Sequence, residues 1–294
     1  DDVTVVRAGE TVAEVKAKDV TARQLAELMV GSELPQPTTH GDTRRTEVTL
    51  ALKDVSIPTS TGSRDLISHI SFNLRAGEVV GIAGVEGNGQ AELVEAIMGL
   101  RKYTGSIDFQ GSSIDDMSVA HRHDLGIGLI PEDRQRQALM MDSPLWENRI
   151  LGHQRGKPVM RGFILDKKAT IEDTKRIMEE FDVRAPGPMT AAAALSGGNQ
   201  QKFIVGREMS KAPALLVASH PTRGVDVGAQ GAIWEVLREA RTQGMAIVLI
   251  SADLEELIGM SDRLLVMLRG VITAELDPQK TTPEQLGSAM TGAA

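Results

Sequence analysis

Short apolar runs alternate with amphipathic stretches along the chain from about residue 47 onwards. Aliphatic runs predict buried strands at 79–83, 214–218 and 245–251. Apolar residues with helical spacing predict helices at 92–98, 167–181 and 228–242. Further strands are expected at 48–52, 66–74, 103–109 and 126–130. Strands that alternate with helices in this way indicate an α/β fold with a mostly parallel sheet.

The two ends of the chain resemble each other. Residues 1–31 align with residues 262–292 without a gap and share ten identities, among them Gly9 with Gly270. Both segments predict a strand, a glycine turn, a second strand and a helix entered through threonine. Coincidence between two βα units would not preserve so many identities. We therefore expect residues 1–31 to be the C-terminal tail of a preceding domain that resembles this one.

The pattern changes again after this tail. Residues 32–46 are polar and contain two prolines, which predicts an extended linker. Residues 47–294 then form the second domain. Within it, residues of about 135–200 predict a mostly helical subdomain, and residues 262–294 predict a C-terminal strand–helix tail.

Composition narrows the classes of function. The 294 residues carry a net charge of −8 and no stripe of Lys and Arg, which argues against a nucleic-acid-binding surface. Cysteine is absent, so no disulfide framework supports the fold. No apolar run approaches the ~18 residues that a membrane-spanning helix needs.

A glycine-rich loop joins the predicted strand 79–83 to the predicted helix 92–98. Strand, glycine loop and helix are the setting of a phosphate-binding P-loop, in which backbone N–H groups hold a polyphosphate. Two glycines stand where the pattern G-x-x-x-x-G-K-[ST] requires them, but Gln90 replaces the lysine and Ala91 replaces the hydroxyl residue. The candidate nucleotide-binding residues are Gly84, Val85, Glu86, Gly87, Asn88, Gly89, Gln90 and Ala91.

A second motif follows the predicted helical subdomain. It predicts a helix N-terminus with a hydroxyl and two backbone amides free of side chains, which is a ready anion site. An ordinary serine-capped helix is the alternative, but the order of loop, helical region, motif and apolar strand favours a functional site. The residues of this motif are Leu195, Ser196, Gly197, Gly198, Asn199 and Gln200.

This order of parts resembles the ATP-binding domains of ABC transporters, and residues 195–200 resemble the ABC signature. Residues 131–134, with Glu132, resemble the Q-loop variant of importers for ribose, galactose and nucleosides, and residues 221–229, with Asp226, resemble their D-loop. The stretches 151–154 and 182–188 favour the nucleoside branch. The resemblance covers residues 47–277.

The resemblance implies a P-loop NTPase fold. Its parts are a mostly parallel core sheet, an antiparallel β subdomain and a helical subdomain. It also implies a chain with two such domains, of which this one is the second.

Several residues depart from the pattern that the resemblance implies. The family's lysine grips the β- and γ-phosphates, and its Ser or Thr binds Mg²⁺. Its Asp and Glu after the strand 214–218 hold the metal and activate water, and a His after the strand 245–251 senses the γ-phosphate. No aromatic residue in 49–70 could stack on adenine. The replacements are Gln90, Ala91, Ser219 for Asp, His220 for Glu, Ala252 for His, and Glu132 for the Q-loop Gln.

These departures predict weak or absent nucleotide binding here. Loss of one charged donor costs about 1.5–3 kcal/mol, or roughly ten- to a hundredfold in affinity. His220 could in principle act as a base, but a base without a held metal and held phosphates has nothing positioned to act on. We therefore expect no competent catalytic residue and no significant ATPase activity from this chain alone.

The resemblance also implies a division of labour. Two ABC domains pair head to tail, and each ATP lies between one P-loop and the other domain's signature. The preceding domain would hold ATP and Mg²⁺, and Ser196, Gly197 and Gly198 would close its site, with Asp226 nearby. The alternative is a nucleotide-independent structural or regulatory module of the same transporter. Soluble tandem ABC proteins that act on ribosomes or DNA are disfavoured by the charge of −8.

The implied partners are transmembrane permease subunits and, indirectly, a solute-binding protein, with no nucleic acid. The implied location is the cytoplasmic face of the cell membrane. Residues 140–146 are unusually apolar for the exposed loop that we expect there. They are either a permease contact or the hydrophobic base of the helical subdomain.

Overall fold

A six-stranded sheet forms the centre of the molecule in the computed structural model, which describes residues 1–7, 9–31, 36–37, 41–59 and 65–293. Its strand order is β14-β13-β5-β12-β11-β8, and all neighbours are parallel except β14, which pairs antiparallel with β13 at one edge. The predicted parallel sheet is confirmed. Its strands are β5 (Val79–Ala83), β8 (Ile127–Ile130), β11 (Leu215–Ser219), β12 (Ala246–Ile250), β13 (Arg263–Leu268) and β14 (Val271–Leu276).

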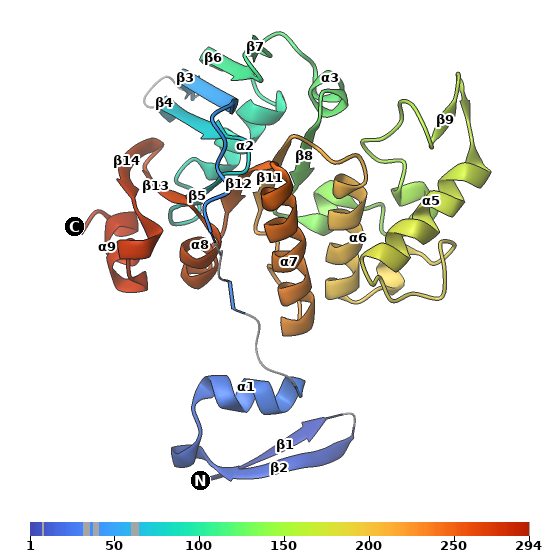
Figure 1. Cartoon of the computed structure of the whole chain (residues 1–294), viewed down its shortest axis with the longest axis vertical. Coiled ribbons are helices and arrows are strands. Elements are labelled where there is room, and N and C mark those ends of the chain that lie inside the picture. Colours follow the sequence, from blue (N-terminus) through green and yellow to red (C-terminus); the bar gives the residue numbers. More distant parts are fainter. Residues whose placement is uncertain (8, 32–35, 38–40, 60–64, 294) are drawn as a thin grey trace.

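An antiparallel sheet covers one face of this core (Figure 1). Its strands are β3 (Val48–Pro58), β4 (Asp65–Arg75), β6 (Thr104–Phe109) and β7 (Ser112–Ser113). Alternate core-strand residues such as Val80 and Ile82 pack against it and against α2 (Gln90–Met98). A short helix, α3 (Val119–Asp124), leads into β8 and is too short to show periodicity in the sequence.

Helices cover the opposite face, where the other residues of each core strand pack, among them Leu216 and Ile247. Local signals set the ends of α7, because Asp226 accepts a hydrogen bond from the N–H of Ala229 and Gly244 takes a left-handed conformation at the C-terminus. The helices on this face are α6 (Gly197–Met209), α7 (Val227–Gln243), α8 (Leu254–Met260) and α9 (Pro283–Thr291).

The predicted helical subdomain contains a π-helical turn (Arg134–Ala138), α4 (Leu145–Asn148), α5 (Lys167–Glu180) and the start of α6. Asp166 caps α5, as the sequence predicts. A small hairpin of β9 (Met160–Arg161) and β10 (Ile164–Leu165) precedes α5.

The apolar stretch 140–146 is largely buried, which favours the second of its two interpretations, the hydrophobic base of the helical subdomain. Leu145 belongs to the core cluster on the helical face of the sheet, Met141 packs against this cluster, and Trp146 is buried. Only Met140 among its large apolar side chains is exposed. These side chains form the hydrophobic base of the helical part because they close its contact with the core, which leaves little apolar surface for a permease.

The N-terminal residues form a separate unit of β1 (Asp2–Arg7), β2 (Glu10–Lys16) and α1 (Ala22–Val30), which lies apart from the core sheet in Figure 1. Of the expected linker, residues 32–35 and 38–40 lie outside the described residues. Residues 36–37 and 41–46 form neither helix nor strand. The chain is tied to the core at Thr43, whose hydroxyl donates to the carbonyl of Gly77 at 2.8 Å.

The internal repeat extends to structural detail. In β1–β2, Val5 pairs with Ala13, and the register shifts at the next residue. In β13–β14, Val266 pairs with Ala274 and the register shifts at the same place. The helices α1 and α9 both begin with a Thr–Gln capping box and both end at a left-handed glycine. The two segments therefore share one local fold, including its irregularities.

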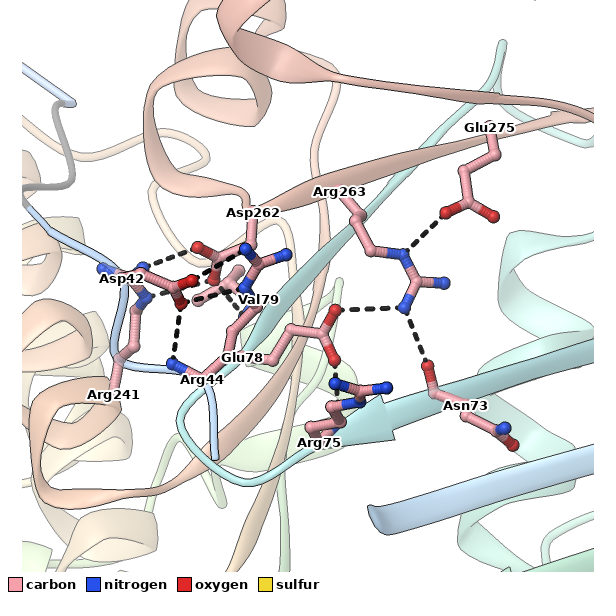
Figure 2. A network of polar contacts seen from close by, with 10 residues as sticks. All are labelled: Asp42, Arg44, Asn73, Arg75, Glu78, Val79, Arg241, Asp262, Arg263 and Glu275. Carbon is pink, nitrogen blue, oxygen red and sulfur yellow. Dashed lines mark hydrogen bonds and ion pairs between the residues drawn. The ribbon is translucent and has the colours of Figure 1, made fainter. Parts of the chain in front are cut away.

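A network of ion pairs fixes the starts of β5 and β13 (Figure 2). The carboxylate of Asp262 accepts hydrogen bonds from the N–H of Val79 at 2.8 Å and from the guanidinium of Arg241 at 2.5 Å. Arg263 bonds Glu78 at 3.0 Å and Glu275 at 2.8 Å. These contacts anchor the end of β5 that lies away from the glycine-rich loop, so the loop leaves a strand that is held in place.

Candidate functional site

The glycine-rich loop leaves the carboxyl end of β5 and enters α2. Gly87 and Gly89 have φ of +86° and +109°, in the left-handed region that glycine adopts without strain. A Cβ atom on Gly84 would lie 2.7 Å from the carbonyl oxygen of Met267. The loop therefore has the backbone path of a phosphate-binding loop, and its glycines are required for that path.

The side chain of Gln90 folds back into this loop. Its Oε1 accepts a hydrogen bond from the backbone N–H of Asn88 at 3.1 Å, and its Nε2 donates to the carbonyl of Val85 at 3.2 Å. Gln90 is only 8% exposed. A phosphate held by such a loop needs its backbone N–H groups as donors. Gln90 thus occupies one of these donors, and it brings no positive charge.

The loop lines a cavity of about 510 Å³ whose charge is predominantly negative. Four carboxylates stand against one guanidinium among its lining residues, and no described lining residue is a lysine. Arg223 is itself paired with Glu132 at 2.7 Å. Such a cavity repels a polyphosphate. The charged residues of the lining are Glu86, Glu92, Glu132, Arg223 and Asp253.

His220 follows Ser219 at the carboxyl end of β11 and lies between this strand and β12. Its φ is +50°, its N–H donates to the carbonyl of Ile250 at 2.7 Å, and its Nδ1 accepts from the N–H of Ala252 at 3.2 Å. Burial lowers the pKa of His220, and the nearby Glu132 carboxylate offsets only part of this effect. The imidazole is therefore neutral at neutral pH and uses Nδ1 to hold the end of β12.

The residues of this cavity do not fit a Mg²⁺ ion at the positions that the family pattern implies. Ala91 has no oxygen to offer, and Ser219 provides a hydroxyl where a carboxylate would be needed.

The signature residues form the N-terminus of α6, outside this cavity. Ser196 is exposed and accepts hydrogen bonds through Oγ from the backbone N–H and the side-chain amide of Asn199, at 3.4 and 3.0 Å. Gln200 is buried and donates to the carbonyl of Leu195 at 3.2 Å. A Cβ atom on Gly198 would lie 2.6 Å from a carboxylate oxygen of Asp226. Signature and D-loop are therefore in close contact.

Arg134 connects the two groups of residues, which the sequence did not reveal. Its guanidinium donates to the carbonyls of Arg223 and Gly224 at 2.7 and 3.2 Å and to Oε1 of Gln200 at 3.3 Å. Arg223 in turn pairs with Glu132 in the cavity. Residues 131–134 thus lie between the loop cavity and the signature.

The structure brings most of the predicted residues together in two places. The glycine-rich loop shares its cavity with Glu132, Ser219, His220 and Ala252. The signature and Asp226 lie together at the start of α6. Two further features were not predicted, namely the inward turn of Gln90 and the buried Glu256, which bonds Thr222 and Trp234 at 2.8 and 2.7 Å.

Comparison with known proteins identifies this arrangement. The family described as "ABC transporter" matches residues 67–223. The chain is 40% identical over 293 residues to the guanosine import ATP-binding protein NupO of Bacillus subtilis, covering 99% of this chain and 57% of NupO. It is also 40% identical to the nucleoside import ATP-binding protein NupA of Lactococcus lactis, covering 58% of that protein. The chain thus spans little more than half the length of these curated relatives.

Solved structures of ATP-binding cassettes share the fold. The ADP conformation of the ABC transporter cassette MJ1267 superimposes with a TM-score of 0.67 at 22% identity and covers 84% of this chain and 96% of its own. The dimeric cassette MJ0796 gives the same TM-score at 20% identity and covers 79% of this chain and 100% of its own. The predicted P-loop fold with a parallel core sheet, an antiparallel sheet and a helical part is confirmed.

Among the residues that the structure describes, no helix has both the length and the apolar character needed to cross a membrane.

The family match covers more than half of the chain, from β4 through the glycine-rich loop and the signature to Arg223. This chain is a member of the ABC transporter family.

Proposed function

We propose that residues 47–294 are the second ATP-binding domain of an importer ATPase, and that this domain acts through its signature rather than through its own P-loop. One observation carries the proposal: the Gln90 side chain fills its own loop, whereas the signature helix keeps its serine cap and both glycines. The domain retains the part that completes a neighbouring site and lacks the parts that hold and cleave its own nucleotide.

The domain's own site is non-hydrolytic in this proposal. The P-loop lysine, the metal ligands, the water-activating carboxylate and the γ-phosphate sensor are all replaced. Four carboxylates in the cavity oppose a polyphosphate. His220 cannot compensate, because its Nδ1 accepts a hydrogen bond from the Ala252 N–H and the residues that would position a metal and phosphates before it are replaced.

The signature supplies the second half of a site whose ATP and Mg²⁺ are held by the preceding domain. Ser196 is exposed at the N-terminus of α6, where backbone N–H groups and the helix dipole favour an anion. Gly197 and Gly198 add no side chain to this helix start, and Gly198 is buried against Asp226. Asp226, which caps α7 beside Gly198, would lie near the interface.

The preceding domain is inferred from the repeated unit. Met290 on α9 is 8% exposed, but its counterpart Met29 on α1 is 58% exposed. Met267 on β13 is fully buried, and its counterpart Val6 is 60% exposed. Residues 1–31 therefore expose apolar side chains whose counterparts are buried in the core clusters on the two sides of the six-stranded sheet. We infer that they complete the sheet of a preceding ABC domain and that residues 32–46 link the two.

The importer carries a nucleoside or a simple sugar. The relatives that match nearly the whole of this chain are named for the import of guanosine, nucleosides, glucose and ribose. The partners are then transmembrane permease subunits and, indirectly, a solute-binding protein, and the domain lies at the cytoplasmic face of the membrane. Reading the coding sequence upstream of Asp1 tests the proposed preceding domain. We expect G-x-x-x-x-G-K-[ST] there, followed by Asp-Glu before a D-loop. The absence of these motifs would contradict the proposal.

A second candidate is a nucleotide-independent interaction module of the same transporter, which the filled loop and the acidic cavity favour. An equilibrium titration of this chain with ATP separates the two at its own loop. Saturable binding at millimolar ATP supports a weak nucleotide site. No saturation in that range supports the interaction module, which binds its partners and holds no functional nucleotide.

A further inference from the structure

A cluster of two histidines and one glutamate lies away from the glycine-rich loop. His123 lies on α3, His153 follows α4, and Glu208 lies near the end of α6. One ligand atom from each residue can be chosen so that all three lie within 4.8 Å of one another. Three segments far apart in the sequence thus bring metal-binding groups together between the core and the helical part.

Three of the four ring nitrogens of the two histidines lack a hydrogen-bond partner. His153 is only 1% exposed, and neither Nδ1 nor Nε2 has a hydrogen-bond partner. Nδ1 of His123 is also buried without a partner. Buried polar atoms are almost always bonded. The two rings meet edge to face with centroids 4.7 Å apart. Neither nitrogen of His153 has a hydrogen-bond donor or acceptor within reach.

The carboxylate of Glu208 is held in place for a ligand role. Its Oε1 accepts from Nε of Arg207 at 2.9 Å, and its Oε2 faces Nε2 of His123 at 3.5 Å. Carboxylates that bind metals are commonly fixed by such an outer hydrogen bond. One oxygen is therefore anchored, and the other points to the histidines.

A cavity of about 660 Å³ opens beside the cluster and includes all three residues in its lining. Its other charged side chains include Arg155, Lys157 and Lys211. A fourth ligand, such as water or a small anion, could reach the ion from this side.

We propose that His123, His153 and Glu208 bind one divalent transition-metal ion, of which Zn²⁺ is the representative case. Two imidazoles and one carboxylate with a fourth position open to solvent are a donor set that zinc accepts. The bound ion would connect α3, the segment after α4 and α6, and would stabilise the contact between the core and the helical part.

The test is a titration of the metal-free chain with Zn²⁺ by calorimetry and with Co²⁺ by visible absorption. We expect one ion per chain and a Co²⁺ spectrum typical of tetrahedral coordination. His153→Ala and Glu208→Gln should each weaken binding by more than about tenfold, since even outer-shell changes cost ten- to a hundredfold. His121→Ala, an exposed histidine on the same helix, should bind like the unsubstituted chain.

Two results would overturn the site. The first is no saturable binding by the unsubstituted chain at about 1 mM metal, an outcome that does not depend on whether the variants fold. The second is undiminished binding in His153→Ala or Glu208→Gln variants whose circular dichroism matches that of the unsubstituted chain.

Discussion

Gln90 stands where the pattern of the glycine-rich loop calls for a lysine. The loop keeps its glycines and its left-handed turns, yet Gln90 bonds the Asn88 N–H and the Val85 carbonyl. A lysine at this position could not accept the Asn88 N–H, so it would free that donor and add a positive charge.

In the Gln90→Lys variant, the affinity of this chain for ATP should rise about ten- to a hundredfold, because a charged donor replaces the neutral amide side chain in the loop. Turnover should not appear, because Ala91, Ser219 and His220 remain. Isothermal titration measures the affinity. Gln279→Lys adds the same charge at an exposed site far from the loop and should leave affinity unchanged; equal affinities for both variants would refute the role given to Gln90.

A second residue-scale prediction concerns Glu256, which is fully buried and has one unpartnered oxygen. Burial raises its pKa above the usual 4.5. Its contribution to stability is therefore complete below pH 4.5 and is lost as the pH rises through the folded-state pKa, with a slope of at most ~1.4 kcal/mol per pH unit.

Glu256→Gln keeps an acceptor for Thr222 and Trp234 but does not titrate. Urea unfolding between pH 4 and 8 should show the variant gaining free energy of unfolding relative to the unsubstituted chain as pH rises. Glu255→Gln, on the exposed side of the same helix, should show no such gain. Parallel curves for Glu256→Gln and the unsubstituted chain would mean that the Glu256 carboxyl titrates normally.

The sequence identifies the residues that depart from the family pattern, because each stands at a countable distance from a motif. It does not reveal where Gln90 points or that Arg134 connects Gln200 to Arg223. Both depend on backbone carbonyls and N–H groups that only the folded loop brings near. The His123, His153 and Glu208 cluster is hidden for the same reason, since its members come from three separate segments.

Among the secondary-structure elements, the long helices and the core strands are predicted by local sequence signals. Asp166 and Gly244 mark the ends of α5 and α7 because capping depends on neighbouring residues alone. The short helices α3 and α8 were not predicted from the sequence, since six or seven residues show too little periodicity. The sequence left two interpretations open for residues 140–146, because apolar content alone does not distinguish a surface patch from a buried base, and their burial favours the base.

The repeated unit allows a matched pair of substitutions. In this chain, Met290→Ala should lower the free energy of unfolding by about 2–5 kcal/mol, as for other buried methionines. Met29→Ala, at the equivalent but exposed position, should change it by less than ~0.5 kcal/mol. Denaturant unfolding followed by Trp146 and Trp234 fluorescence measures both effects on the 47–294 domain, which contains the two tryptophans.

The same pair tests the preceding domain. In the complete protein, Met29→Ala should destabilise the preceding domain to an extent comparable with the effect of Met290→Ala here, because Met29 would be buried there. An effect of Met29→Ala that stays below ~0.5 kcal/mol in the complete protein would show that residues 1–31 do not pack as their counterpart does.

The whole molecule contains two candidate sites, the glycine-rich loop and the start of α6, and we expect them to serve different functions. The cavity at the glycine-rich loop contains the Gln90 side chain and an excess of carboxylates, whereas α6 begins with an exposed serine cap followed by two glycines. In the function that we propose, such a domain contributes to turnover when another domain brings ATP to its signature. Loss of function at the signature should therefore affect the partner's site.

The most direct measurement is ATP turnover by the complete protein carrying Ser196→Arg. An arginine at this exposed cap would block the N–H groups of α6, so we expect turnover to fall at least about a hundredfold, the range seen when a preorganised donor is lost. Ser112→Arg, on the exposed strand β7, should retain the wild-type rate. Turnover near the wild-type rate in Ser196→Arg would contradict a site completed by this domain's signature.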